Sequence, residues 1–166
     1  MKVIDNFINS DDCNNIFFQL VHSNYFPWFY IPKSIPSDDH SLFQHNFFIE
    51  NIKSEKYDII LPLINKLNSI IKYKDIARIK ANLYVNKNKK EKHKKHTDID
   101  DYDNFITAIY YLNTTNGYTT IGKKKIKDKK NRLVFFNGLT PHFGTTQTDT
   151  KERVLINFNL LLWANF

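Results

Sequence analysis

The chain has 166 residues, of which 42 % are hydrophobic and 15 % aromatic, and its formal net charge is +7. This length and composition suit one domain with a sizeable core, and they exclude a disordered chain and a membrane-spanning segment. The charge allows a partner that carries phosphates or an acidic surface, but the lysines cluster in two runs, 87–95 and 123–130, which favours solvated loops.

Before residue 55 we expect one strand, one helix and a long irregular segment. The strand is expected over 4–8. Ser10 is a good N-cap for a helix that begins near Asp11, where an early carboxylate suits the positive end of the helix dipole. Residues 24–50 contain three prolines and many aromatic residues. This composition indicates irregular structure, with a strand that begins near Trp28.

From residue 55 onward we expect one further helix and then only strands. An amphipathic helix is expected over 55–72, in which Pro62 predicts a kink or a late start. The pattern then changes to short strands separated by turn residues. These strands are expected over 76–85, 105–112, 118–121, 124–127, 132–136, 142–145 and 153–162. The order of elements predicts an α+β fold, with a barrel or double-sheet jelly roll backed by helices.

Three of the expected strands have one face that is more polar than the other, because side chains alternate along a strand. The polar faces carry Lys80, Asn82 and Tyr84; Thr107, Ile109 and Tyr111; and Arg153, Leu155, Asn157 and Asn159. One interpretation is that these faces meet solvent while the apolar faces form the core. The other is that the polar faces line a small cavity inside a barrel.

Two histidines and one carboxylate in the C-terminal half form a candidate metal site. His96 and Asp98 lie two residues apart, so on an extended segment both side chains point the same way. His142 follows Pro141 shortly after an apolar strand. Two histidines and one carboxylate are the ligand set of non-haem Fe(II) oxygenases, and they leave coordination positions open. Zinc could bind the same residues, but the open geometry favours iron.

Arg153 is a candidate residue for binding a co-substrate, whereas the remaining histidines are assigned no role in binding. Arg153 begins the last strand and is suited to hold the carboxylate of an organic co-substrate by a bidentate contact, which favours iron over zinc further. His93 is interpreted as a loop residue beside the better placed His96. The other histidines have no such context and are expected in surface or core roles: His22, His40 and His45.

The stretch 76–162 resembles the Fe(II)/2-oxoglutarate-dependent dioxygenases of the prolyl 4-hydroxylase type, close to the hypoxia-inducible-factor prolyl hydroxylases and their small phage-encoded homologues. The matching motifs occur in the family's order. They are Asn82-Leu83-Tyr84, His96-Thr97-Asp98, Thr107-Ala108-Ile109-Tyr110-Tyr111-Leu112-Asn113, Arg132-Leu133-Val134-Phe135-Phe136, Pro141-His142 and Arg153-Val154-Leu155-Ile156-Asn157.

The resemblance implies a double-stranded β-helix, with 1–166 as one dioxygenase domain in which 1–75 is a helical support region and 76–166 the catalytic core. It implies Fe(II) bound by His96, Asp98 and His142, with dioxygen as oxidant and ascorbate as a further reductant. It also implies that 2-oxoglutarate is held by five residues: Arg153, Tyr111, Tyr84, Asn157 and Ile109.

The resemblance further implies an oxidoreductase that hydroxylates a prolyl residue of a protein or peptide and releases succinate and carbon dioxide. The absence of a signal peptide and the single cysteine predict a cytoplasmic location, which is the host cytoplasm if a phage encodes the chain. The positions expected to face the oxidised substrate are Asn82, Asn104 and Asn159. Asn104 and Asn159 stand where the closest family members carry an arginine and a tryptophan.

Because of these departures, three alternatives stay open. The first is a nucleic-acid dioxygenase of the AlkB type, which the net charge and Asn82-Leu83-Tyr84 favour. That group carries a second arginine six residues after the first, where this chain has Asn159, and no base-stacking lid is evident. The second is a hydroxylase of free amino acids. The third is a jelly-roll binding module without metal.

Overall fold

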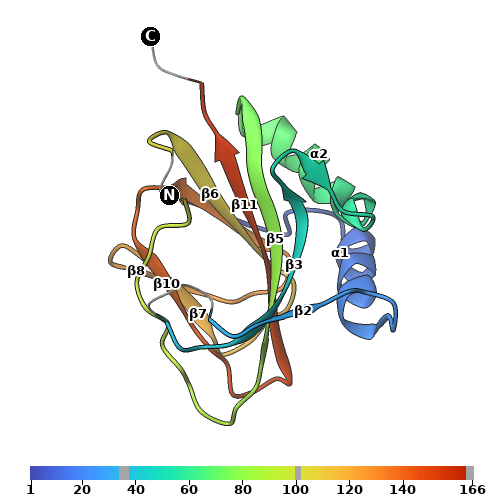
Figure 1. The fold of residues 1–166 in the computed structure, drawn as a ribbon, viewed down its shortest axis with the longest axis vertical. Coiled ribbons are helices and arrows are strands. Elements are labelled where there is room, and N and C mark those ends of the chain that lie inside the picture. Colours follow the sequence, from blue (N-terminus) through green and yellow to red (C-terminus); the bar gives the residue numbers. More distant parts are fainter. Residues whose placement is uncertain (34–37, 100–101, 164–166) are drawn as a thin grey trace.

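Two antiparallel sheets and a pair of helices make up the computed structural model, which describes residues 1–33, 38–99 and 102–163 (Figure 1). The larger sheet has eight strands in the order β1-β9-β6-β11-β5-β3-β2, with β4 paired to β3. Its strands are β1 (Lys2–Asp5), β2 (Phe29–Ile31), β3 (Leu42–Ile49), β4 (Ile52–Lys53), β5 (Asp75–Val85), β6 (Phe105–Tyr111), β9 (Arg132–Asn137) and β11 (Glu152–Leu161).

The smaller sheet has three strands in the order β10-β7-β8. They are β7 (Tyr118–Ile121), β8 (Lys124–Lys127) and β10 (His142–Thr145). All seven strands expected after residue 76 are therefore present, each within about one residue of its expected ends. The α+β class and the two-sheet arrangement predicted from the sequence are confirmed.

The first half of the chain departs from the expected pattern. Residues 42–49 form β3, although that stretch was predicted to be irregular. The register of β3 against β5 shifts between Asn46 and Phe48, and the neighbouring Phe47 and Phe48 are both buried. A bulge of this kind breaks the period-2 alternation by which a strand is recognised. Residues 1–75 were predicted to be a helical support region. They also contain the four strands β1 to β4 of the large sheet, so the region is not only helical.

The first helix begins close to the predicted position, but its N-cap differs from the prediction. The helix α1 spans Ser10–Phe17, and its N-cap is Asn9 rather than Ser10. The Asn9 side chain accepts a hydrogen bond from the backbone N–H of Asp12 at 2.8 Å. A π-helical turn, Phe18–His22, follows directly. The first strand ends earlier than expected, at Asp5 instead of residue 8.

The second helix begins late, which is one of the two outcomes that Pro62 predicted. The helix α2 spans Leu61–Ile70 and is preceded by a 3-10 turn, Tyr57–Ile60. Pro62 lies in its first turn, where a missing backbone N–H costs no intrahelical hydrogen bond. No helix in the described part of the chain is long and apolar enough to cross a membrane.

The two faces of β11 pack against different parts of the protein. Its apolar face, made by Val154, Ile156, Phe158 and Leu160, packs in one cluster with Ile16 of α1, Leu20 of the π-helical turn, and Leu63 and Leu67 of α2. Figure 1 shows both helices on one side of the large sheet. Leu155, on the opposite face, packs with residues between the sheets: Ile109, Tyr111, Ile121, Val134 and Phe136. The helices therefore cover one face of the sheet, and the smaller sheet lies over the other.

The Asn131 side chain joins the N-terminal segment to the strands. It is buried, accepts hydrogen bonds from the Ile8 backbone N–H at 3.1 Å and the Tyr110 hydroxyl at 3.0 Å, and donates to the Ile8 carbonyl at 2.8 Å. Asn131→Ala is expected to lower the free energy of unfolding by about 2–4 kcal/mol, because buried polar groups lose their partners. Urea denaturation measures this difference.

Asn88→Ala is the matched control for this prediction. Asn88 also has a φ of 60°, as Asn131 does, but its side chain is exposed. Both substitutions carry the same cost of a positive φ in alanine. Equal losses of stability in the two variants would mean that backbone conformation, not the buried hydrogen bonds, is responsible.

Candidate functional site

A pocket lies between the two sheets and is lined by the polar strand faces identified from the sequence. The large sheet contributes Leu42, Gln44, Arg78, Lys80, Asn82, Tyr84, Ile109, Arg153, Leu155 and Asn157. The small sheet and the segment before β6 contribute Thr119, His142, Gly144, His93, His96, Thr97 and Asp98. The alternation therefore reflects a cavity, and the interpretation that these faces meet solvent is wrong.

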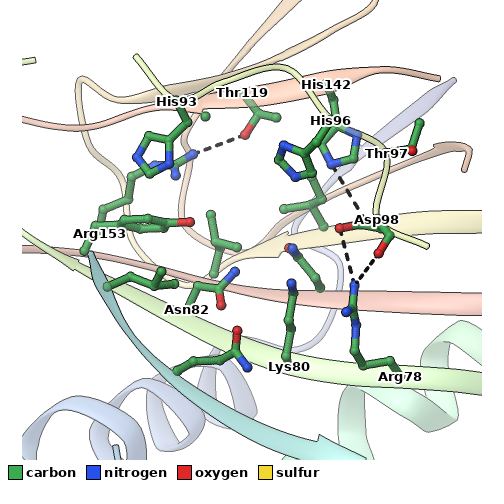
Figure 2. A pocket seen from close by; sticks show the side chains of 17 residues that line it. Arg78, Lys80, Asn82, His93, His96, Thr97, Asp98, Thr119, His142 and Arg153 are labelled. Carbon is green, nitrogen blue, oxygen red and sulfur yellow. Dashed lines mark hydrogen bonds and ion pairs between the residues drawn. The ribbon is translucent and has the colours of Figure 1, made fainter. Parts of the chain in front are cut away.

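The three candidate metal ligands come together at one end of this pocket (Figure 2). His96 and His142 form a β-bridge, with backbone N–H···O hydrogen bonds of 3.0 and 2.9 Å. This bridge fixes the segment that carries Asp98 against β10. The potential ligand atoms of His96, Asp98 and His142 all lie within 4.8 Å of one another.

Backbone carbonyls set the orientation of both histidine rings. The Nδ1 of His96 lies 3.1 Å from the Lys94 carbonyl oxygen, and the Nδ1 of His142 lies 3.2 Å from the Thr140 carbonyl oxygen. A carbonyl oxygen only accepts, so each Nδ1 carries the proton. The Nε2 atoms are then free to bind a metal, which is the usual arrangement around a histidine ligand.

Asp98 is held by residues of the large sheet. Its Oδ2 accepts hydrogen bonds from Asn159 at 3.0 Å and Thr107 at 3.1 Å, and Arg78 lies 3.6 Å from its Oδ1. Arg78 also donates to the Asn159 side chain at 3.2 Å. These contacts orient Asp98 toward His142, whose Nε2 is 3.7 Å from Oδ2.

The charges around Asp98 and His142 favour the protonation states that bind metal. Burial raises the pKa of Asp98, but the nearby charges of Lys80, His142 and Arg78 outweigh it and lower the pKa. Burial lowers the pKa of His142, which Asp98 only partly opposes. An ionised carboxylate and neutral imidazoles are the forms that bind a metal ion. The ligand set therefore fits Fe(II).

Arg153 is buried in the other half of the pocket and already forms an ion pair. Its Nε donates to Asp128 at 2.6 Å, and its Nη2 donates to Asp128 at 3.0 Å and to Thr119 at 3.1 Å. Burial alone would lower the pKa of Arg153, but the carboxylate of Asp128 raises it. The Nη1 lies beside Gly144, where an added Cβ would be 3.3 Å from it.

The second half of the pocket fits an organic anion. Among the described residues, the Tyr111 hydroxyl and the side-chain oxygens of Asn82 and Asn157 are buried and have no hydrogen-bond partner, although Thr119 lies close to Tyr111. Burial raises the pKa of Tyr84 to about 12, so its hydroxyl keeps its proton and can donate. The Tyr111 and Tyr84 hydroxyls and Nη1 of Arg153 can donate hydrogen bonds to a carboxylate, whereas the two amide oxygens can only accept them from a donor group.

Sequence reasoning missed three residues that support the site: Asp128, Arg78 and Thr107. Asp128 is the one acidic residue in the lysine run 123–130, and this position was an available signal. Thr107 and Arg78 share the polar strand faces with residues that were identified. Their roles follow from contacts across the sheet, which alternation does not reveal.

Two residues predicted to face the substrate lie elsewhere than expected. Asn159 is completely buried behind Asp98, and it does not line the pocket. Asn104 is exposed and donates to the Trp163 carbonyl oxygen at 2.9 Å. Asn82 does line the pocket. Among these three residues, Asn82 is therefore the one that the structure places where it can contact a substrate.

Of the other histidines, His22 and His45 have the surface and core roles that were expected, whereas His93 and His40 lie together around a carboxylate. His22 is exposed, and His45 is buried with its ring bonded to the Pro27 carbonyl and the Ser54 hydroxyl. These confirm the surface and core roles. His93 is in a loop, as expected, but only 6 % of it is exposed, and it lies with His40 around a carboxylate.

The family model described as the 2OG-Fe(II) oxygenase superfamily matches residues 79–161. A prolyl-4-hydroxylase from Pseudomonas putida has 15 % sequence identity and a TM-score of 0.70, with 98 % of this chain and 92 % of that chain covered. A viral collagen prolyl hydroxylase from Paramecium Bursaria Chlorella virus-1 has 21 % identity and a TM-score of 0.60, with 98 % and 90 % covered.

A third similar structure is a prolyl hydroxylase from Trichoplax adhaerens, in complex with a peptide fragment of the hypoxia inducible factor oxygen degradation domain. It has 17 % identity and a TM-score of 0.70, with 96 % of this chain and 82 % of that chain covered. None of the curated proteins matches the sequence. At these identities the likeness concerns the fold, which is the double-stranded β-helix. The expectation of a phage origin has no support in these matches.

Proposed function

We propose that this chain, which belongs to the 2OG-Fe(II) oxygenase superfamily, hydroxylates a prolyl residue of a protein or peptide and converts 2-oxoglutarate to succinate and carbon dioxide. Membership of the superfamily makes the chain an oxidoreductase. The observation that carries the proposal is the position of His96, Asp98 and His142 in the same pocket as Arg153. The cytoplasmic location, the single-domain organisation and a role for ascorbate stay predictions.

The metal half of the pocket would hold Fe(II) through His96, Asp98 and His142. Bound iron supplies the activation of dioxygen that C–H hydroxylation needs. The chain's own contribution is to keep three ligands on one side, so that coordination positions stay open toward the pocket. Asn159 and Thr107 keep Asp98 in place for this role.

The other half of the pocket would hold 2-oxoglutarate. We assign the distal carboxylate to Nη1 of Arg153 and the Tyr111 hydroxyl, because both residues are buried, the Tyr111 hydroxyl has no hydrogen-bond partner, and the bonds to Asp128 and Thr119 use Nε and Nη2 of Arg153. Tyr84, Asn157 and Ile109 complete this half of the site. Asp128 occupies the opposite edge of the guanidinium and so fixes its plane.

A prolyl substrate is supported by the similar structures, three of which are prolyl hydroxylases, and one of these holds a peptide. In this chain the substrate would enter past Leu42 and Gln44 of β3 and reach the iron beside Asn82 and Lys80. Lys80 lines the pocket, and its burial there lowers the pKa of its ammonium group to about 8.

A nucleic-acid substrate is the alternative that one observation favours. The lysine run 87–95 contains His93, which lines the pocket, so a positively charged segment borders one side of it. Against this alternative, the position of the second arginine in nucleic-acid dioxygenases is the buried Asn159. A free amino acid as substrate has no specific support in the pocket.

One assay tests the proposed function. The protein is purified without oxygen and loaded with Fe(II), and succinate formation from 2-oxoglutarate is measured with ascorbate present. Parallel samples contain proline-rich peptides, methylated oligonucleotides or free amino acids. We expect proline-containing peptides to raise succinate formation and to gain one oxygen atom, detected by mass spectrometry.

Each other outcome of this assay has a defined meaning. Stimulation by oligonucleotides or by free amino acids alone would replace the prolyl substrate with one of those classes. No iron binding and no consumption of 2-oxoglutarate in any sample would overturn the assignment of the site itself.

A further inference from the structure

A second group of potential metal ligands lies at the edge of the pocket, apart from His96, Asp98 and His142. It consists of Asp38, His40 and His93, whose potential ligand atoms all lie within 4.8 Å of one another. Asp38 and His40 precede β3, whereas His93 belongs to the segment between β5 and β6. The group therefore joins two segments that are far apart in the sequence.

Both imidazole rings present a nitrogen to the same carboxylate. The Nδ1 of His40 contacts Oδ1 of Asp38, and the Nδ1 of His93 lies 3.5 Å from its Oδ2. The two rings stack, with centroids 4.7 Å apart and planes 22° apart. Two nitrogens and one carboxylate thus converge on one small volume, as ligands around an ion do.

Two of the three side chains are buried, and the third, His40, is partly exposed. Asp38 is 1 % exposed and His93 is 6 % exposed, while His40 closes the outer side. The backbone N–H of Lys94 donates to Oδ2 of Asp38 at 3.0 Å, which orients the carboxylate. The Oε2 of Glu91 lies 3.8 Å from Nε2 of His40, the ring nitrogen that does not contact Asp38, so a carboxylate lies near both nitrogens of this ring.

We propose that Asp38, His40 and His93 bind a divalent transition-metal ion, of which zinc fits the ligands best. Two imidazole nitrogens and one carboxylate oxygen suit zinc, with water as a fourth ligand. Zinc also binds such ligands more strongly than Fe(II) does. The carboxylate of Asp38 would offset part of the charge of the ion, whereas Glu91 already pairs with Lys87 and Lys89.

A metal ion at this position would fasten part of the wall of the pocket. His93 lines the pocket, and so does Leu42, at the start of β3 shortly after His40. The ion would hold the segment before β3 against the lysine-rich segment 87–95. Its role is structural and does not rest on the proposed hydroxylase activity.

The stoichiometry of zinc binding tests this proposal with a pair of substitutions. The full chain is stripped of metal with a chelator and dialysed against low micromolar zinc chloride, and bound zinc is measured by elemental analysis. We expect two equivalents for the wild type, one for His142→Ala, one for His40→Ala and none for the double variant. His22→Ala, which changes an exposed histidine outside both groups, should keep two.

The results for the two single variants show separately whether each of the two sites binds zinc. His142→Ala protein without zinc would overturn the second site, because Asp38, His40 and His93 remain intact in it. His40→Ala protein without zinc would instead show that the His96, Asp98 and His142 group binds no zinc. Zinc should also raise the melting temperature of His142→Ala but not that of the double variant. An equal effect on both would mean that the ion binds elsewhere.

Discussion

His142→Ala is expected to abolish Fe(II)-dependent formation of succinate, with a loss of more than about 100-fold, since changes to outer-shell residues alone cost up to that much. His142 is buried, and its Nε2 lies 3.7 Å from Oδ2 of Asp98, another of the three candidate iron ligands. Without it, only His96 and Asp98 remain to hold the ion. Turnover of 2-oxoglutarate and the iron content of the protein are measured on the same samples.

The control for this substitution is His22→Ala. His22 is exposed at the end of the π-helical turn and contacts Phe17 and Phe18 rather than the pocket. We expect its turnover and iron content to match those of the wild type. Unchanged turnover in His142→Ala protein that still contains iron would remove His142 from the ligand set.

The strands after residue 76 were predictable because each keeps a regular alternation over its whole length. On β11, Val154 and Ile156 enter the main core while Arg153 and Leu155 face the pocket, and the sequence shows this directly. The same rule failed for β3, where the bulge between Asn46 and Phe48 places two adjacent phenylalanines in the interior.

The candidate iron ligands were predictable because His96 and Asp98 are close in sequence and because the motif order resembles that of a known family. The residues that contact Arg153 and His93 were not predictable from the sequence. Asp128 reaches Arg153 only through the pairing of strands, and Asp38 meets His93 only after β3 pairs with β5. Contacts between distant segments depend on the fold, so composition and spacing do not indicate them.

Arg153→Ala is expected to raise the concentration of 2-oxoglutarate needed for half-maximal turnover by about 100-fold. Loss of a charged partner for a buried carboxylate costs about 3 kcal/mol, and each 1.4 kcal/mol corresponds to a factor of ten. The maximal rate at saturating 2-oxoglutarate should change much less, because Arg153 lies in the half of the pocket away from the metal ligands. Initial rates of succinate formation over a range of 2-oxoglutarate concentrations measure both quantities.

The ion pair with Asp128 complicates this substitution and also provides its control. Arg153→Ala leaves the buried Asp128 carboxylate without its cation, which costs about 3–5 kcal/mol of stability. The double variant Asp128→Asn/Arg153→Ala removes both charges, so its stability should recover while its requirement for 2-oxoglutarate stays high. If the double variant instead regained the wild-type requirement, the effect of Arg153→Ala would come from unfolding, and Arg153 would not bind the co-substrate.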